Sequence, residues 1–196
     1  MSGVTTGVGR REEKRRERGG RIYAEAMRLF QRDGFDNVKV DMIAKAARVS
    51  VPTFYAHFPS KETMLMPLPA REELAAAFAA QPRHLSVADR ARGVILAWLE
   101  QVDTHARDVV LERWRIVATT PSLRLRSAEF ERVTAALVLD VLRAENSGDV
   151  APAATVTVNA LMSAYTQIVL RWADDEGSRD LLDIAREVLA ELRDQL

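Results

Sequence analysis

Residues 49–62 read VSVPTFYAHFPSKE and gather aromatic, polar and proline residues in one short stretch of an otherwise regular sequence. Ser50 can cap a helix that starts after it, because its hydroxyl can accept a hydrogen bond from a free amide of the first turn. Pro52 is tolerated in that turn, where the amide that proline lacks would be unpaired. Pro59 should end the helix, so we expect a helix of barely two turns over residues 50–57.

A second short helix is predicted immediately before this one. Between residues 40 and 47 the apolar residues repeat with the i, i+3, i+4, i+7 spacing of one helical face, at Val40, Ile43, Ala44 and Ala47. The pair Arg48-Val49 leaves room only for a tight turn. Two short helices joined in this way are typical of a helix-turn-helix, whose second helix enters the major groove of DNA.

Helices are also expected on both sides of this pair. Before it, residues 11–33 carry an apolar stripe that stops at Gly34, and its members are Ile22, Ala26, Leu29 and Phe30. After it, Ser60 can cap a fourth helix that begins at Lys61. That helix must kink or break at the prolines of 67-PLP-69.

The segment IAKAARVSVPTFYAHFPSKETML, preceded by AMRLFQRDGFDNVKV, resembles the DNA-binding domain of the TetR family of bacterial transcription regulators. The residues that stand at the family's spacing are Phe30, Gly34, Ile43, Ala44, Val49, Ser50, Thr53, Tyr55, His57, Phe58, Ser60, Lys61 and Glu62. The other three quarters of the chain matches the family only in helix count and length. The resemblance implies an all-α, two-domain, homodimeric regulator with a DNA-binding head and an effector-binding body.

Roles can be assigned to the exposed residues of the helix over residues 50–57. Base edges should meet its solvent-facing side, formed by Val51, Pro52, Thr53 and Ala56. Thr53 is the hydrogen-bonding member of that side. Tyr55 and His57 carry polar tips that suit phosphate oxygens, and Lys61 can hold a phosphate at the start of the fourth helix; the resemblance implies the same three contacts. The full set of expected DNA contacts is Lys39, Arg48, Ser50, Val51, Pro52, Thr53, Tyr55, Ala56, His57 and Lys61.

Three of these residues depart from the family's pattern. Lys39 stands where Thr or Ser usually caps the helix over residues 40–47; a lysine can contact phosphate but cannot cap. Arg48 occupies a turn position usually held by Gly, so a left-handed backbone there would cost about 1 kcal/mol. Pro52 replaces a common Gly. These changes bear on the operator sequence more than on DNA binding itself.

The formal net charge of the chain is zero but unevenly distributed. Residues 1–61 carry 13 basic and 7 acidic residues (+6), which leaves 15 basic and 21 acidic residues (−6) for the rest. This asymmetry favours a nucleic-acid-binding head. We expect residues 1–20 to form a flexible basic arm that strengthens DNA binding in a salt-sensitive way. Its basic members are Arg10, Arg11, Lys14, Arg15, Arg16 and Arg18. Alternatively, Glu12, Glu13 and Glu17 can pair with Arg16 and Arg21 at i, i+4 spacing and extend the first helix.

The remainder of the chain predicts a bundle of five to six longer helices. The expected segments are 86–106, 107–120, 122–145, 151–176 and 178–196. Ser86 and Asp89 stand in capping-box spacing at the start of the first of these. The third should end at 146-NSG-148. The β-branched run over residues 155–158 has no partner strand, so it is predicted to be helical as well.

Bundles can hold ligands between facing helices. Several residues here place polar or aromatic groups on otherwise apolar faces: Trp98, Gln101, Arg113, Trp114, Val117, Asn159, Met162, Tyr165 and Thr166. Each residue taken singly is explained as well by core packing, but together they predict a mainly apolar cavity for a small hydrophobic effector. Arg113 suits either an acidic group of that effector or a structural ion pair. The resemblance implies that the effector relieves repression.

The last predicted segment carries a wide apolar face, formed by Leu181, Leu182, Ile184, Ala185, Val188, Leu189 and Leu192. Such a face exceeds the single stripe that packing inside one subunit requires. We therefore expect the last two helices to form a homodimer. A two-fold dimer predicts a palindromic operator with half-site centres about one helical turn apart, or a multiple of it.

Nothing in the sequence marks an enzyme. The three histidines, His57, His84 and His105, fit no two-histidine zinc spacing, and no phosphate-loop, dinucleotide or nucleophile-elbow motif is present. The chain has no cysteine, which excludes disulfides and thiolate metal sites. The acidic run over residues 174–176 suits a solvated turn. We therefore expect no metal and no cofactor.

No apolar run approaches the roughly 20 residues of a membrane span, and no apolar region follows the charged N-terminus, so we expect a cytoplasmic protein. The predicted organisation is a basic arm (1–20), a helix-turn-helix domain (21–62) and a ligand-binding and dimerisation domain (63–196). The predicted function is that of a DNA-binding repressor released by a small molecule. Two alternatives remain open: a helical interaction protein whose basic head docks an acidic protein partner, and a DNA-binding protein without an effector.

Overall fold

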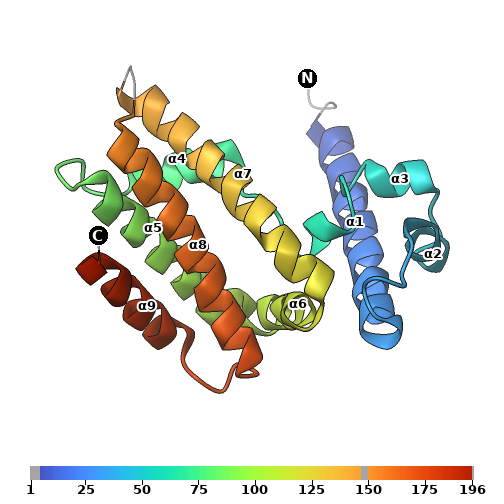
Figure 1. The fold of residues 1–196 in the computed structure, drawn as a ribbon. Helices are drawn as coiled ribbons and strands as arrows, with labels where there is room; N and C mark the ends of the chain where they lie inside the picture. The colour runs from blue at the N-terminus through green and yellow to red at the C-terminus, as the bar shows by residue number, and fades with distance from the viewer. Residues whose placement is uncertain (1–4, 147–149, 196) are drawn as a thin grey trace. The chain divides into compact units, whose positions relative to one another are not determined.

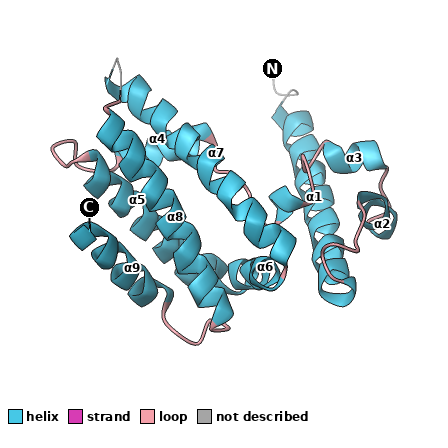
Figure 2. Cartoon of the chain, in the orientation of Figure 1, coloured by secondary structure: helices cyan, strands magenta, loops and turns pink. Residues whose placement is uncertain are grey.

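The computed structural model describes residues 5–146 and 150–195 of the chain, and its regular elements are all helices, with no strand among those residues (Figure 2). The all-α class predicted from the sequence is thus confirmed. The chain divides into two compact units, Met1–Leu65 and Met66–Leu196. The division lies three residues beyond the boundary expected from the sequence.

The first unit is built on one long helix, α1 (Thr5–Asp33), which is accompanied by α2 (Val40–Ala46) and α3 (Val51–Tyr55). In Figure 1 the two short helices lie beside α1. The core of this unit takes apolar side chains from all three helices, each at most 2% exposed: Ile22, Ala26, Phe30, Ile43 and Phe54. The apolar stripe predicted for the first helix is therefore its packed face.

The N-terminal half of α1 differs from the expectation. Residues 5–20 continue α1 without a break, so the prediction of a flexible arm over residues 1–20 is wrong for this part. Residues 1–4 lie outside the described part of the chain. The stretch lacks proline and is rich in Arg, Glu and Lys, which are good helix formers. Residues 9–18 are exposed throughout, so this half of the helix adds nothing to the core.

The helix predicted to begin at Lys61 does not form. Glu62–Met64 is a single 3₁₀ turn, residues 67–70 are not helical, and α4 (Arg71–Ala79) begins only after them. Ser60 does cap the short turn, because its hydroxyl accepts a hydrogen bond from the Thr63 amide at 3.3 Å. Proline disfavours helical backbone in the residue before it, so the segment 67-PLP-69 delays the next helix.

In its described residues, the second unit is a bundle of six helices: α4, α5 (Val87–Gln101), α6 (Arg107–Thr119), α7 (Pro121–Asn146), α8 (Pro152–Asp174) and α9 (Leu181–Gln195). Helix α8 packs against α5, α6, α7 and α9. The helix predicted over residues 86–106 is interrupted by a π-helical segment, Val102–Ala106. The end predicted for the third long helix at residues 146–148 falls largely outside the described residues.

Helix α8 is apolar and 23 residues long, and its length and hydropathy alone would allow it to cross a membrane. The expectation that no segment approaches a membrane span is thus wrong on composition. Its neighbours on four sides and its buried residues, such as Leu161, Ile168 and Trp172 at 0% exposure, identify it as the core helix of the bundle. The β-branched run over residues 155–158 is helical, as predicted.

The apolar face of α9 turns out to be used mainly within its own unit. Its members Leu181, Ile184, Ala185, Val188 and Leu189 are buried, and α9 packs on α5 and α8. The width of this face was the reason for expecting a dimer, and that reason is therefore largely removed. Only Leu182 and Leu192 of the set remain partly exposed.

Candidate nucleic-acid interface

The turn between α2 and α3 has the geometry that the sequence predicted. Arg48 adopts a left-handed backbone conformation with φ of 54°, and the Val49 amide donates to the Ala44 carbonyl at 2.9 Å. A non-glycine residue in this region costs about 1–2 kcal/mol. The Arg48 side chain is exposed next to α3. The strained turn thus presents a cation at the edge of the candidate interface.

The N-terminus of α3 is held by its predicted cap. The Ser50 hydroxyl accepts a hydrogen bond from the Thr53 amide at 3.2 Å and lies 2.7 Å from the Thr53 hydroxyl. A hydroxyl has one donor hydrogen and two acceptor lone pairs, so Thr53 keeps hydrogen-bonding capacity after this contact. The cap therefore fixes the Thr53 side chain in one orientation without saturating it.

Helix α3 (Val51–Tyr55) buries Phe54, leaves Thr53 half-buried and exposes its other residues. Phe54 is fully buried and fixes the helix to the core, with its ring centroid 5.4 Å from that of Tyr55. Tyr55 is 52% exposed and Val51 37% exposed, and Pro52 and Ala56 are also exposed. The residues predicted to meet DNA therefore lie on the free side of a helix that is anchored by a single aromatic ring.

His57 follows α3 and packs against α1. A Cβ added at Gly19 would come within 3.2 Å of the His57 Nδ1 atom, so the absence of a side chain at Gly19 makes room for the imidazole. Burial, followed by the positive charges of Arg15 and Arg18, lowers the pKa of His57 below its ordinary value. The charged groups of α1 that share grooves with the ring are Glu12, Arg15, Arg16 and Arg18.

Lys61 is engaged differently from the expectation. Its ammonium donates hydrogen bonds to the carbonyls of Phe35 and Val38 at 2.8 and 3.0 Å, and lies 4.1 Å from the centroid of the Phe35 ring. Two of its three N–H donors are thus directed at the loop between α1 and α2. Without the fourth helix, Lys61 also lacks the helical amides that were expected to share a phosphate with it. The structure gives Lys61 the role of holding the α1–α2 loop.

Lys39 precedes α2 and makes no side-chain cap, as expected for a lysine at this position. Its side chain is exposed. A different residue ties the end of α2 to α1: Arg21 donates from Nε to the Ala47 carbonyl at 3.0 Å. The sequence had suggested a pairing of Arg21 with the acidic residues of the arm, and the structure replaces it with this contact.

The structure adds residues of α1 to the interface. Arg15 and Arg18 line an open groove of 620 Å³ together with residues of α3 and its flank, namely Pro52, Thr53, Ala56 and His57. The sequence predicts that both arginines strengthen DNA binding as part of a flexible arm, but it assigns them no place beside α3. Their i, i+3 spacing on a continuous helix was the signal that could have joined them to the site.

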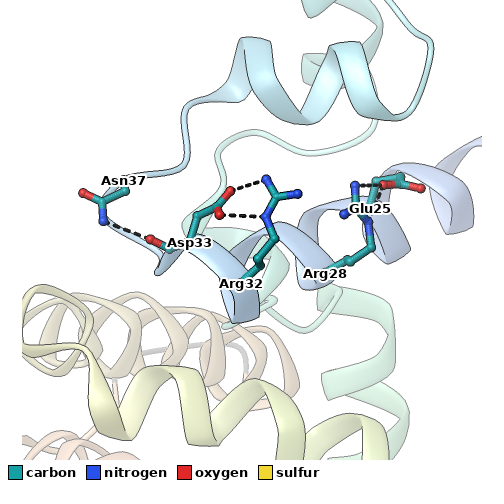
Figure 3. A network of polar contacts seen from close by, with 5 residues as sticks. All are labelled: Glu25, Arg28, Arg32, Asp33 and Asn37. Carbon is teal, nitrogen blue, oxygen red and sulfur yellow. Dashed lines mark hydrogen bonds and ion pairs between the residues drawn. The ribbon is translucent and has the colours of Figure 1, made fainter.

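The opposite end of α1 has its charges neutralised locally. Figure 3 shows Arg28 against Glu25, at 2.8 Å, and the guanidinium of Arg32 donating twice to Asp33, at 2.7 and 2.6 Å. Asn37 donates to the Asp33 carbonyl and closes the turn after the helix. Free basic charge on α1 is therefore concentrated in its first half.

The second unit contains a separate, mainly apolar cavity of 250 Å³. Its walls come from the segment before α4 and from α4, α5, α7 and α8: Pro67, Leu68, Pro69, Glu73, Ile95, Trp98, Phe130, Thr134, Met162 and Tyr165. Burial raises the pKa of the Tyr165 hydroxyl, and the nearby charge of Arg113 opposes this rise. Trp114 supports the wall from behind, with edge-to-face contacts at 6.5 Å to both Phe130 and Tyr165.

Three of the nine residues expected to bind an effector lie in the wall of this cavity: Trp98, Met162 and Tyr165. Val117 and Thr166 are fully buried core residues. Gln101 and Asn159 are exposed, and Asn159 donates to the Thr155 carbonyl. Arg113 is half-buried and is not part of the wall; the charged residue in the wall is Glu73.

The wall also contains residues that the sequence did not suggest, such as Ile95, Phe130 and Thr134. The prolines of 67-PLP-69 had been noted only as helix breakers. Within residues 5–146 and 150–195, no group of three or more His, Asp or Glu side chains is arranged to hold a metal ion.

Part of the chain is similar in sequence to known transcriptional regulators. Residues 22–66 match the family of bacterial regulatory proteins described as the tetR family. The chain is 46% identical over 52 residues to the HTH-type transcriptional regulator EthR of Mycolicibacterium smegmatis. The matched stretch covers 26% of this chain and 24% of EthR. The chain is also 38% identical over 68 residues to the HTH-type transcriptional regulator TcmR of Streptomyces glaucescens, a stretch that covers 34% of this chain and 30% of TcmR. The similarity thus spans less than a third of these relatives.

Solved structures resemble the whole fold. NalD of Pseudomonas aeruginosa, the secondary repressor of the MexAB-OprM multidrug efflux pump, superposes with a TM-score of 0.58 at 19% identity over 90% of this chain and 95% of its own. FadR of Thermus thermophilus, a TetR-family repressor crystallised with lauroyl-CoA, gives 0.50 at 24% identity over 88% and 91%. The helix-turn-helix region, residues 22–66, matches the tetR family of bacterial regulatory proteins, and the all-helical fold agrees with this match.

Proposed function

We propose that the protein is a transcriptional regulator, acting as a repressor, that binds an operator through α3 and is released by a small-molecule effector. The observation that carries the proposal is the free face of α3. This helix is capped by Ser50, anchored by the buried Phe54 and otherwise exposed next to basic residues. A short rigid helix with a free face is the element that the major groove admits.

Within this proposal the residues of the interface divide into two kinds. Thr53 is the base reader, because its hydroxyl is oriented by Ser50 and retains hydrogen-bonding capacity. Val51, Pro52 and Ala56 give apolar contacts, for which thymine methyl groups are suitable partners. Tyr55, His57, Lys39 and Arg48 are placed to contact phosphates, which fix position and carry no direct sequence information.

Fluorescence anisotropy with labelled duplexes, repeated over a range of salt concentrations, tests the proposal. Tyr55→Phe should weaken binding to operator and scrambled duplexes alike, because a phosphate contact is lost. Thr53→Ala should instead change the preference among sequences, since a well-made base contact is worth about 1–3 kcal/mol. A protein that binds no duplex at low salt but captures an acidic protein would establish the alternative function of a helical interaction module.

The effector in this proposal occupies the cavity of the second unit. The cavity volume of 250 Å³ lies below the about 300–1,000 Å³ of typical small-molecule pockets, so the occupant is compact. Rings and aliphatic side chains dominate the wall, and its charged member is the acidic Glu73. Since Arg113 lies outside the wall, the expectation of an acidic effector loses its basis. We propose a small apolar molecule without a carboxylate.

Release of DNA follows from the chain connection. The cavity wall includes 67-PLP-69, which begins two residues after Leu65, the last residue of the first unit. An occupant that displaces this segment acts on the stretch that joins the two units. A coupling free energy of about 1–3 kcal/mol would weaken operator binding about 5- to 150-fold.

Titration with uncharged hydrophobic compounds tests this part, with Trp98 fluorescence reporting occupancy and anisotropy reporting operator release. Trp98→Phe separates the signal of the cavity from those of Trp114 and Trp172. We expect the compound that changes Trp98 emission to release DNA over the same concentration range. Occupancy without release would show that the cavity is not coupled to the operator.

We further propose a homodimer through the outer face of α8 and the end of α9. Small and polar residues line a shallow groove of 410 Å³ there, including Ala160, Ser163 and Ala164 of α8 and Leu192 of α9. Val156, on the same helix, is 63% exposed. Small residues let helices of two subunits approach closely, and a two-fold axis follows for a symmetric pair. Sedimentation equilibrium of Ala160→Glu should give a monomer, whereas an unchanged mass would place the interface elsewhere.

A further inference from the structure

The first half of α1 has no packing role within its own unit. Residues 9–18 are exposed throughout, whereas the second half supplies core residues such as Ile22. Most helical stability in proteins comes from packing of one face, and this half of the helix packs no such face. Between residues 10 and 18 it presents six basic and three acidic side chains, a net charge of +3. A surface of this kind suits a polyanion.

The side of α1 that faces α3 changes character at Gly19. Ile22 belongs to the buried stripe of this side. Four and seven residues earlier, positions of the same helical face carry Arg18 and Arg15. Gly19 lies at the crossover, where its missing side chain lets His57 pack against the helix. The apolar stripe that fixes the helix-turn-helix is therefore continued by arginines.

These arginines share a groove with the recognition helix. Arg15 and Arg18 line the groove of 620 Å³ whose opposite wall is formed by Pro52, Thr53 and Ala56. Arg15 reaches the Ala56 carbonyl with Nη2 at 3.5 Å, a long contact that leaves its other donors free. Among the residues that the structure describes, neither arginine forms an ion pair with a carboxylate. Both guanidinium groups are thus available at the edge of α3.

We infer that Arg15 and Arg18 bind DNA backbone phosphates beside the base pairs contacted by α3, which makes α1 a further DNA-binding helix of this protein. The inference rests on the proposed function, because it takes α3 as the element in the major groove. Guanidinium matches phosphate in a bidentate geometry and stays charged at all relevant pH values. Because both groups stand on a preformed helix, their binding does not require an arm to become ordered.

The length of the exposed half of α1 sets the reach of this contact. At about 1.5 Å rise per residue, the four steps from Gly19 to Arg15 cover about 6 Å. This equals about two base pairs at about 3.4 Å each. The protein should therefore require up to about two base pairs of flanking duplex beyond the bases that α3 contacts.

The test compares two double variants of the full-length protein by anisotropy over a range of salt concentrations. Arg15→Ala/Arg18→Ala should lower the slope of log affinity against log salt by about 1.8, or about 0.9 for each lost phosphate contact. It should weaken binding to operator and scrambled duplexes equally and lose the benefit of longer flanks. Arg28→Ala/Arg32→Ala removes the same charge from the paired end of the helix and should keep the wild-type slope (Figure 3).

A charge-preserving variant, Arg15→Lys/Arg18→Lys, should keep most of the salt slope. This result would show that the alanine variant loses slope because it lacks the charges and not because it is misfolded. A wild-type slope for Arg15→Ala/Arg18→Ala would overturn the inference while leaving operator binding intact. Equal slope losses in both alanine pairs would also overturn it, since the effect would then be one of net charge. If the wild-type protein binds no duplex, the proposed function fails, and this inference fails with it.

Discussion

Replacing Lys61 by methionine separates the role that the structure gives this residue from the role expected from the sequence. The substitution keeps most of the side-chain volume but removes an ammonium that donates to the Phe35 and Val38 carbonyls at 2.8 and 3.0 Å. Hydrogen bonds to a charged group are worth about 1.5–3 kcal/mol each, and partial exposure lets water replace some of this. The lost cation–π contact with Phe35 adds about 0.5–1 kcal/mol. We expect a loss of about 2 kcal/mol in the local stability of the first unit.

Native-state hydrogen exchange of peptides covering residues 35–47 measures this loss directly. A change of about 2 kcal/mol corresponds to about 30-fold faster exchange through opening of this segment. Lys45→Met, which removes an exposed lysine from α2, should leave the exchange of these peptides unchanged. The salt slope of DNA binding should be the same for Lys61→Met and the wild type. If hydrogen exchange is unchanged and the salt slope of DNA binding falls by about 0.9, Lys61 does not hold the α1–α2 loop and contacts a DNA phosphate instead.

Three further predictions concern the turn, the second unit and the response to pH. Arg48→Gly should raise the stability to urea by about 0.5–1 kcal/mol, because φ of 54° is strained for arginine, and should weaken DNA binding at low salt. Arg90→Met should lower the free energy of unfolding in urea by about 3 kcal/mol, because it removes the 2.8 Å ion pair with Glu145 and the hydrogen bond to the Phe78 carbonyl. The double variant Arg90→Met/Glu145→Met leaves no unpaired charge and should recover much of this loss. His57, whose pKa is lowered in the free protein, contributes stability above pH 6.5 that is lost as the pH falls through its folded value. A phosphate beside His57 raises that pKa again, so operator affinity should increase as the pH falls below 6.5, and titration calorimetry of His57→Gln should show this dependence abolished.

Local features of the first unit could be predicted from the sequence because neighbouring residues determine them. The cap at Ser50, the left-handed turn at Arg48 and the burial of the stripe on α1 each depend on spacings of a few residues. The partner of Lys61 could not be predicted in this way. Its acceptors lie 23 and 26 residues earlier in the chain, and only the folded loop brings them to the ammonium.

The sequence could not decide between a flexible arm and a continued α1, for a different reason. A run of alternating charges without apolar residues gives no periodic signal, so a solvated arm and an exposed helix look alike in sequence. The absence of proline and the good helix propensity of Arg, Glu and Lys were the available indications. The consequence for function is direct, because only a continuous helix holds Arg15 and Arg18 beside α3.

The sequence predicted a mainly apolar cavity between the helices of the second unit, but it identified only some of the residues in its wall. Trp98, Met162 and Tyr165 line it, since large apolar side chains in the middle of long helices tend to face the interior. Asn159 instead faces solvent, and its amide donates to the Thr155 carbonyl of the same helix. The π-helical segment Val102–Ala106 also breaks the regular period after α5, which an assignment based on α-helical spacing does not anticipate.

Selection of bound duplexes from a random-sequence library tests the central claim most directly, because it asks whether α3 reads DNA at all. We expect the wild-type protein to enrich one sequence, arranged as an inverted repeat with half-site centres about one helical turn apart or a multiple of it. We also expect Thr53→Ala to enrich a sequence altered at defined positions within each half-site. Recovery of no common sequence by the wild-type protein, or of the same sequence by Thr53→Ala, would contradict recognition of DNA by this helix as described.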